Sequence, residues 1–218
     1  MVIKMRKILL RIFIFSITLI INQGFAQDVW EYRSHYEIAY SASNTLDFKI
    51  KPKTWFREII NDLYSSDVEI GFDKKFNNWM SFSPYYRHIV QFKENDRLIE
   101  YRSQVDIAFF GKLNNLSFNN RNRFEYRIKE DNNSVRYRNK LTIKSPVYFH
   151  DKIRISVAGE PFYDCTEKEF NKTRIYLNLI FPIENNITIE IFYILEHIKR
   201  EEKWQSLNAL GTTLKYKI

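Results

Sequence analysis

The sequence predicts an all-β protein that forms a closed up-and-down antiparallel transmembrane β-barrel of ten to twelve strands, with twelve favoured. Three observations lead to this prediction. Apolar and polar residues alternate with a period of two along nearly the whole chain, which is the period of a β-strand. The alternating runs reach about 10–15 residues, whereas soluble strands average about 5–6 and bilayer-spanning strands need about 9–11. Aromatic residues, 17% of the chain, recur near the ends of the runs, as in the aromatic girdles of membrane barrels.

Residues 1–26 are predicted to be a cleaved secretory signal peptide. Four basic residues precede or enter a short apolar run that ends near Ile21, and small residues follow at Gly24 and Ala26. This order is typical of a secretory leader, whereas an uncleaved membrane anchor would need about 20 apolar residues. Residues 27–218 then form the predicted barrel domain. The leader holds four of the 34 basic residues and none of the 26 acidic ones, so its removal lowers the formal charge from +8 to +4.

The barrel strands are expected as a succession of alternating runs. In the run at residues 99–109, for example, Ile99 and Tyr101 alternate with Glu100 and Arg102. Clusters of Asn, Asp and Ser, which tolerate tight-turn dihedral angles, separate the runs. About eleven runs are present, and because single-chain bacterial barrels have an even number of strands, we favour twelve. The clearest runs cover residues 30–40, 46–50, 68–72, 99–109, 116–128, 135–144, 153–157, 174–181, 187–196 and 210–218.

Composition excludes several other classes of protein. The single cysteine, Cys165, argues against a disulfide scaffold and against a zinc cluster. Five glycines and five prolines exclude a collagen-like chain. The mild charge of the mature chain, without a helix of clustered Lys and Arg, argues against nucleic-acid binding. We therefore expect no cofactor, no metal and no nucleic acid.

Alternation alone does not separate a membrane barrel from a soluble β-domain, because both have one apolar and one polar face. A membrane barrel turns the apolar face to lipid and the polar face to the lumen. The length of the runs favours the barrel. A soluble periplasmic β-domain that binds a ligand in its core stays open as an alternative.

On the barrel interpretation, the lumen-facing positions carry more arginine than glutamate. Guanidinium and carboxylate groups pair in bidentate geometry, so neighbouring strands could interlock through such pairs. One interpretation is structural, because a narrow lumen must be filled by mutually satisfied polar groups. The other is that excess arginine attracts a small anionic ligand or a lipid head group. The predicted lumen polar ladder comprises Glu100, Arg102, Arg121, Arg123, Glu125, Arg127, Arg136, Arg138, Arg154, Glu160, Arg174 and Glu190.

The sequence predicts no catalytic residues. Outer-membrane lipid hydrolases place a His and a Ser two positions apart on one strand, and none of the four histidines here has a serine at that spacing. A Ser/His site assembled across strands stays open, since chain order does not define such sites. We leave enzymatic activity undecided and favour a non-enzymatic role.

Several short motifs occur in order along most of the mature chain: Trp30, Tyr86-Arg87, Glu100-Tyr101-Arg102, Arg121-x-Arg123-x-Glu125, Arg136-Tyr137-Arg138, Glu160-Pro161-Phe162 and Asn171-Lys172-Thr173-Arg174. Together they resemble a family of Bacteroidetes outer-membrane β-barrels known only as a domain of unknown function. The resemblance implies a bacterial outer-membrane location, with outer-membrane lipid and the outer-membrane assembly machinery as partners, and it supplies no reaction. We expect a structural protein, or a narrow pore or binding site for a small anionic solute; the alternative activity is an outer-membrane lipid-modifying hydrolase.

Overall fold

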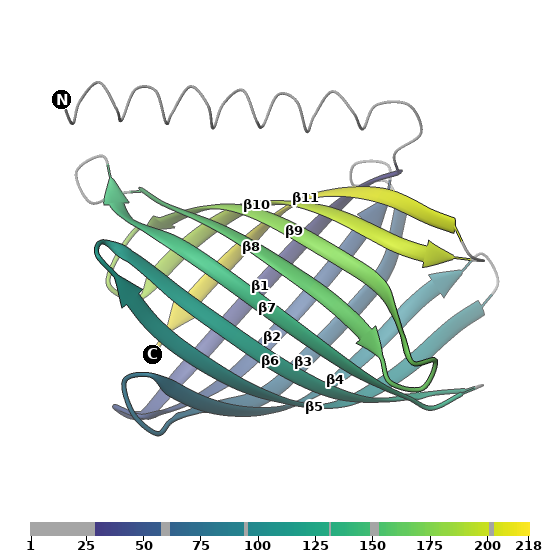
Figure 1. The fold of residues 1–218 in the computed structure, drawn as a ribbon, viewed down its shortest axis with the longest axis horizontal. Coiled ribbons are helices and arrows are strands. Elements are labelled where there is room, and N and C mark those ends of the chain that lie inside the picture. Colours follow the sequence, from purple (N-terminus) through teal and green to yellow (C-terminus); the bar gives the residue numbers. More distant parts are fainter. Residues whose placement is uncertain (1–28, 58–61, 94–95, 131, 149–152, 201–202) are drawn as a thin grey trace.

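A computed structural model shows the chain as one barrel of long strands (Figure 1). It describes residues 29–57, 62–93, 96–130, 132–148, 153–200 and 203–218, and the predicted signal peptide lies outside these ranges. Among the residues described, no helix is long and apolar enough to cross a membrane. The strands in these ranges are β1 (Val29–Ser43), β2 (Leu46–Arg57), β3 (Asp62–Lys75), β4 (Met80–Lys93), β5 (Asp96–Leu113), β6 (Leu116–Lys129), β7 (Ser134–Tyr148), β8 (Ile153–Asp164), β9 (Glu169–Pro182), β10 (Ile187–Arg200) and β11 (Lys203–Lys217).

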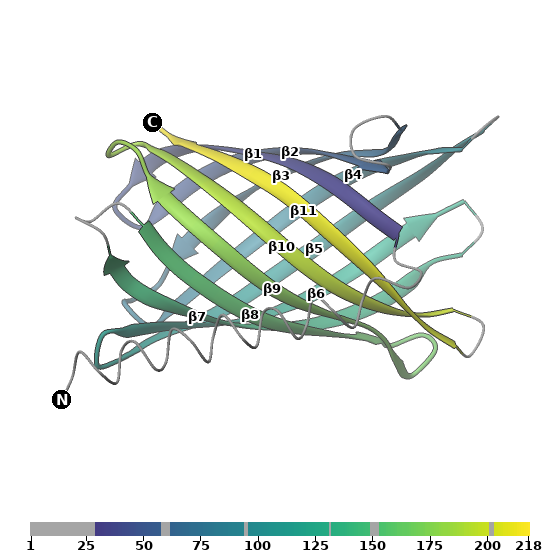
Figure 2. The same ribbon diagram turned by 90° about the horizontal axis from the view of Figure 1, so that it is seen from above.

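The sheet closes on itself, which confirms the predicted barrel. Each strand pairs antiparallel with the next from β1 to β11, and β1 then pairs with β11. These two strands lie side by side in Figure 2. Because the described strands number eleven, the first and last run in the same direction, and the closing pair is parallel, from Val29 opposite Leu207 to Ala39 opposite Lys217.

Eleven strands lie within the predicted ten to twelve, whereas the preference for twelve and the expectation of antiparallel pairing throughout are corrected. Twelve strands were favoured because single-chain bacterial barrels have an even number of strands, and the described residues form eleven. An odd number still closes the sheet when one pair is parallel, and parallel pairing is only slightly less stable per residue than antiparallel pairing. The alternating runs themselves correspond to strands.

The faces of the strands are arranged as in a membrane barrel. In β5, Glu100 and Arg102 are buried in the interior, whereas Ile99 and Tyr101 are exposed on the outside. The same inversion recurs around the sheet, because side chains of successive strand residues point to opposite faces. Large apolar side chains thus cover the exterior, and charged side chains fill the interior.

The interior also holds a small apolar cluster, which packs near the closing pair. It comprises Ala158, Tyr176, Phe192, Ile194 and Ala209. The ring of Phe192 lies where a side chain at Gly211, its partner across β10 and β11, would otherwise stand. Aromatic side chains therefore pack over glycine as well as over charged residues inside the barrel.

Where the connecting residues are described, short turns join the strands, as at residues 114–115 and 165–168. We call the end of the barrel at which β1 begins the Val29 end, and the opposite end, at which β11 finishes, the Ile218 end. Strands β2, β4, β6, β8 and β10 finish at the Val29 end. The two-residue turn between Leu113 and Leu116 was predicted from its asparagines, and Asn114 adopts the positive φ of 53° that such a tight turn requires.

Candidate functional site

The charged interior of the barrel is the candidate site. Of the twelve predicted ladder residues, the structure joins nine into two groups of ion pairs. The other three are Arg174, which pairs with Glu196; Glu190, which pairs with Lys215; and Arg154, which has no ion pair among the residues described. The two groups are Glu100, Arg102 and Arg127, and Arg121, Arg123, Glu125, Arg136, Arg138 and Glu160.

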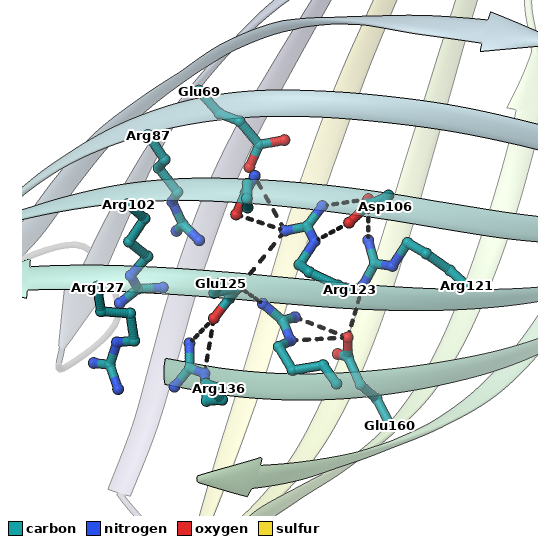
Figure 3. Close-up of polar contacts among 12 residues, drawn as sticks. Glu69, Arg87, Arg102, Asp106, Arg121, Arg123, Glu125, Arg127, Arg136 and Glu160 are labelled. Carbon is teal, nitrogen blue, oxygen red and sulfur yellow. Dashed lines mark hydrogen bonds and ion pairs between the residues drawn. The ribbon is translucent and has the colours of Figure 1, made fainter. Parts of the chain in front are cut away.

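Glu125 on β6 is the centre of the larger group (Figure 3). Its carboxylate is 2.6 Å from Nη2 of Arg136 and accepts a 2.7 Å hydrogen bond from Nη1 of Arg138. Arg136 lies directly opposite Glu125 on β7, and Arg138 lies two residues further along the same face. Glu125 is 1% exposed, and two guanidinium groups compensate the cost of burying its charge.

Glu160 on β8 binds side chains from three other strands. It accepts hydrogen bonds of 2.6 Å from Arg121 on β6 and 2.8 Å from Nη2 of Arg138 on β7. The hydroxyl of Tyr176 on β9 also donates a hydrogen bond to it. Arg138 therefore bridges Glu125 and Glu160, and Figure 3 shows both carboxylates between guanidinium groups of neighbouring strands.

Glu100 on β5 holds the smaller group. Arg102 donates two hydrogen bonds to it, 2.7 and 2.9 Å long, and Arg127 on β6 donates two more, 2.6 and 3.3 Å long. Both arginines thus share one carboxylate near the Val29 end. Next to them, Arg87 on β4 makes two hydrogen bonds to Asp67 on β3, 2.8 and 2.7 Å long.

Asp67 and Arg87 belong to a set of interior charges that the predicted ladder omitted. Asp106 binds Arg123 through two hydrogen bonds of 2.6 and 2.8 Å. The signal for Asp106 was present, because it occupies a polar position of the run at residues 99–109 that also holds Glu100. Asp67 and Arg87 lie outside the clearest runs. The omitted charges that the structure buries inside are Glu31, Arg33, Asp67, Glu69, Arg87, Asp106, Asp164 and Glu196.

Two aromatic side chains lie within the charged interior. Trp55 on β2 faces the guanidinium of Arg33 at 4.5 Å from its ring centroid. Phe162 on β8, 1% exposed, faces Arg138 at 4.4 Å and Arg174 at 5.0 Å. Such cation–π contacts add to the ion pairs and fill volume between long charged side chains.

Two cavities remain between these side chains. The larger, of about 300 Å³, is lined by ten basic residues but by only three carboxylates, those of Glu37, Glu69 and Glu190. The smaller, of about 140 Å³, is lined by seven basic residues and no carboxylate. The basic residues of the larger cavity are Arg33, Lys51, Lys53, Arg87, Arg121, Arg123, Arg138, Lys140, Arg174 and Lys215.

The described histidines and the cysteine form no triad of nucleophile, histidine and carboxylate. His197 on β10 contacts Ser206 on β11, with Nδ1 and Oγ 3.1 Å apart on the outer face, and no carboxylate among the described residues contacts this histidine. Cys165 is exposed in the turn between β8 and β9. No group of three possible metal ligands occurs within the described ranges.

Comparison with known proteins places the chain in a family. A solved structure described as "NanC porin structure in rhombohedral crystal form" has a TM-score of 0.55 and 14% identity, over 86% of this chain and 97% of that chain, which shows a shared fold. The "KdgM porin" has a TM-score of 0.49 and 13% identity, over 87% of this chain and 98% of that chain. No curated protein matches. The model of a family described as "Protein of unknown function (DUF2490)" matches residues 29–207. The protein therefore belongs to this family, as the resemblance of its motifs to a barrel family without assigned function predicted.

Proposed function

We propose that the protein is an outer-membrane barrel whose lumen binds and conducts small anionic solutes. The observation that carries this proposal is the lining of the larger cavity, where ten basic side chains face three carboxylates. Most of these basic side chains pair with carboxylates that lie behind the lining, so the surface that a solute meets inside the cavity is mainly cationic. Such a surface raises the local concentration of anions.

The exterior supports the membrane location. Aromatic and aliphatic side chains such as Tyr36, Phe124 and Leu179 are exposed around the barrel. In water, so much apolar surface would favour aggregation, whereas in a bilayer it meets lipid tails. The soluble periplasmic alternative needs the opposite arrangement of faces.

The dimensions favour small solutes over general diffusion. A cavity of about 300 Å³ is at the lower limit of small-molecule sites, which span about 300–1,000 Å³. Eight-stranded barrels have filled interiors and wide channels need about sixteen strands, so eleven strands suit a narrow path.

Conductance of the purified protein in planar bilayers under a KCl gradient tests this function. We expect a small conductance whose reversal potential is shifted toward the equilibrium potential of chloride. The variant Lys140→Glu should reduce the anion preference, because Lys140 lines the larger cavity and has no ion-pair partner among the described residues whose charge would be left uncompensated. Lys75→Glu, at an exposed strand end, is the matched control and should change little. A folded protein that does not conduct, or that prefers cations, would overturn the proposal.

The contact of His197 with Ser206 supports a second candidate, the lipid-modifying hydrolase. Their side chains meet on the outer face, where phospholipid would lie. Hydrolysis would require Ser206 as nucleophile and His197 as general base. Release of fatty acid from labelled phospholipid that is lost in Ser206→Ala would favour this activity, and conductance without release would reject it.

A further inference from the structure

The smaller cavity has the lining of an oxyanion site. It lies toward the Val29 end, encloses about 140 Å³ and is walled by side chains from strands on both sides of the barrel. Its lining residues are Trp55, Ser65, Arg87, Ile89, Gln91, Arg102, Arg127, Arg136, Arg138, Phe162, Lys172 and Arg174. The carboxylates that balance these cations lie outside the lining, so that the cavity itself is faced by positive groups.

Three of these arginines form an unusual row. Arg87, Arg102 and Arg127 are direct cross-strand partners on β4, β5 and β6. Figure 3 shows their side chains one after another on these strands. Like charges directly opposite each other on a sheet are destabilising, and an anion in front of the row would offset the repulsion.

The count of charges leaves room for a dianion. Seven cations line the cavity, and five carboxylates pair with them: Asp67, Glu100, Glu125, Glu160 and Glu196. Four of the five are also within 4.0 Å of a further cation outside the lining. The excess around the cavity is therefore at least two positive charges.

Hydrogen-bond donors are also available. Arg87, Arg102 and Arg127 each bind their carboxylate through Nε and Nη2. The guanidinium fork has five N–H donors, so Nη1 and the second proton of Nη2 form another edge that can bind a second oxyanion. The carboxylate contacts thus orient the arginines without using all of their donors.

We propose that the smaller cavity binds a compact tetrahedral oxyanion of the phosphate class. This inference rests on the proposed function in that it names the preferred anion of one part of the same lumen. A water molecule takes up about 30 Å³, so the cavity holds one phosphate with a few waters and excludes a nucleotide or an oligosaccharide. Inorganic phosphate carries between one and two negative charges at neutral pH and accepts bidentate hydrogen bonds from arginine.

Isothermal titration of the full barrel in detergent with inorganic phosphate, at constant ionic strength set by NaCl, tests the proposal. We expect saturable binding in the presence of excess chloride, and competition by sulfate, which has the same tetrahedral shape and a similar negative charge. Arg127→Gln should weaken phosphate binding by about tenfold, the effect of about 1.4 kcal/mol. This variant leaves Glu100 paired with Arg102, so no carboxylate loses its last partner.

Two further variants keep the test decisive. Arg127→Lys retains the charge with a different donor geometry and should bind phosphate with intermediate affinity; it replaces Arg127→Gln if that variant fails to fold. Arg97→Gln removes a charge from an exposed position near the same end of β5 and should bind as the original protein does. Equal weakening by Arg127→Gln and Arg97→Gln, or no binding above that of chloride, would overturn the proposal.

Other measurements distinguish free phosphate from a phosphate ester, and distinguish this inference from the proposed function. Glycerol phosphate should bind no more tightly than phosphate, because a cavity of about 140 Å³ leaves little room for the glycerol group. Tighter binding would overturn the choice of the free ion and assign a phosphate ester instead. Anion-selective conductance without phosphate binding would reject this inference alone. Phosphate binding by a barrel that does not conduct would reject only the proposed conduction.

Discussion

At the scale of single residues, the interior is organised by the geometry of arginine. The pairs Arg87–Asp67 and Arg123–Asp106 each join two nitrogens to two oxygens at 2.6–2.8 Å. Lysine offers a point charge and cannot make this planar contact, which explains why arginine occupies the deepest positions. Each carboxylate then aligns the arginines that face a cavity.

The carboxylate of Glu125 is buried and is the ion-pair partner of Arg136 among the described residues. Replacing it in Glu125→Gln leaves Arg136 buried without this partner, so we expect the free energy of unfolding to fall by about 3–5 kcal/mol. Urea unfolding in lipid vesicles measures this loss. Asp47→Asn is the control, since its partner Lys217 is 53% exposed and such a pair contributes about 0–1 kcal/mol. Equal effects of the two variants would show that burial does not determine the strength of these pairs.

At the scale of strands, packing between β10 and β11 depends on Gly211. A Cβ atom there would lie 2.3 Å from the carbonyl oxygen of Arg33 and 2.3 Å from Cζ of Phe192. Gly211→Ala should therefore destabilise the barrel by about 1–3 kcal/mol, the usual effect of overpacking. Gly159→Ala on β8 is a matched control, because a Cβ atom at Gly159 would meet no neighbouring atom within 4 Å. Thermal loss of the folded band on unboiled gels compares them; equal stabilities would refute the close packing at Gly211.

How far the strands could be predicted depends on the information that the alternation of apolar and polar residues carries. Alternation indicates strands and faces, so the long β5 was predicted with its polar face at Glu100 and Arg102. Alternation does not specify the register in which neighbouring strands pair. Arg138 contacts Glu160, 22 residues away, only because β7 and β8 pair in the register that the structure shows. The ladder was therefore predicted by residue type, whereas the pairing of its members and both cavities required the fold.

At the scale of the whole molecule, the direction of the closing pair depends on whether the number of strands is odd or even. Pairing between the two ends of a chain leaves no local mark in the sequence, so the parallel contact of β1 with β11 could not be predicted from alternation. An even count would have made this pair antiparallel. The parallel direction of the closing pair, together with its register, is thus the feature that distinguishes the eleven described strands from the twelve that were favoured.

Engineered cysteines test this register directly. Tyr36 and Leu214 are partners across the closing pair, and both are exposed on the outer face. Neighbouring strands lie about 4.8 Å apart, within the range of Cα distances that a disulfide spans. In a Cys165→Ser background, Tyr36→Cys with Leu214→Cys should form a cross-link that changes mobility on non-reducing gels. Tyr36→Cys with Tyr216→Cys is the control, because a shift of two residues raises the Cα separation to about 8 Å, beyond disulfide reach. A cross-link in the control alone would place the strands in another register, and none in either would show that β1 and β11 do not close the barrel in the membrane.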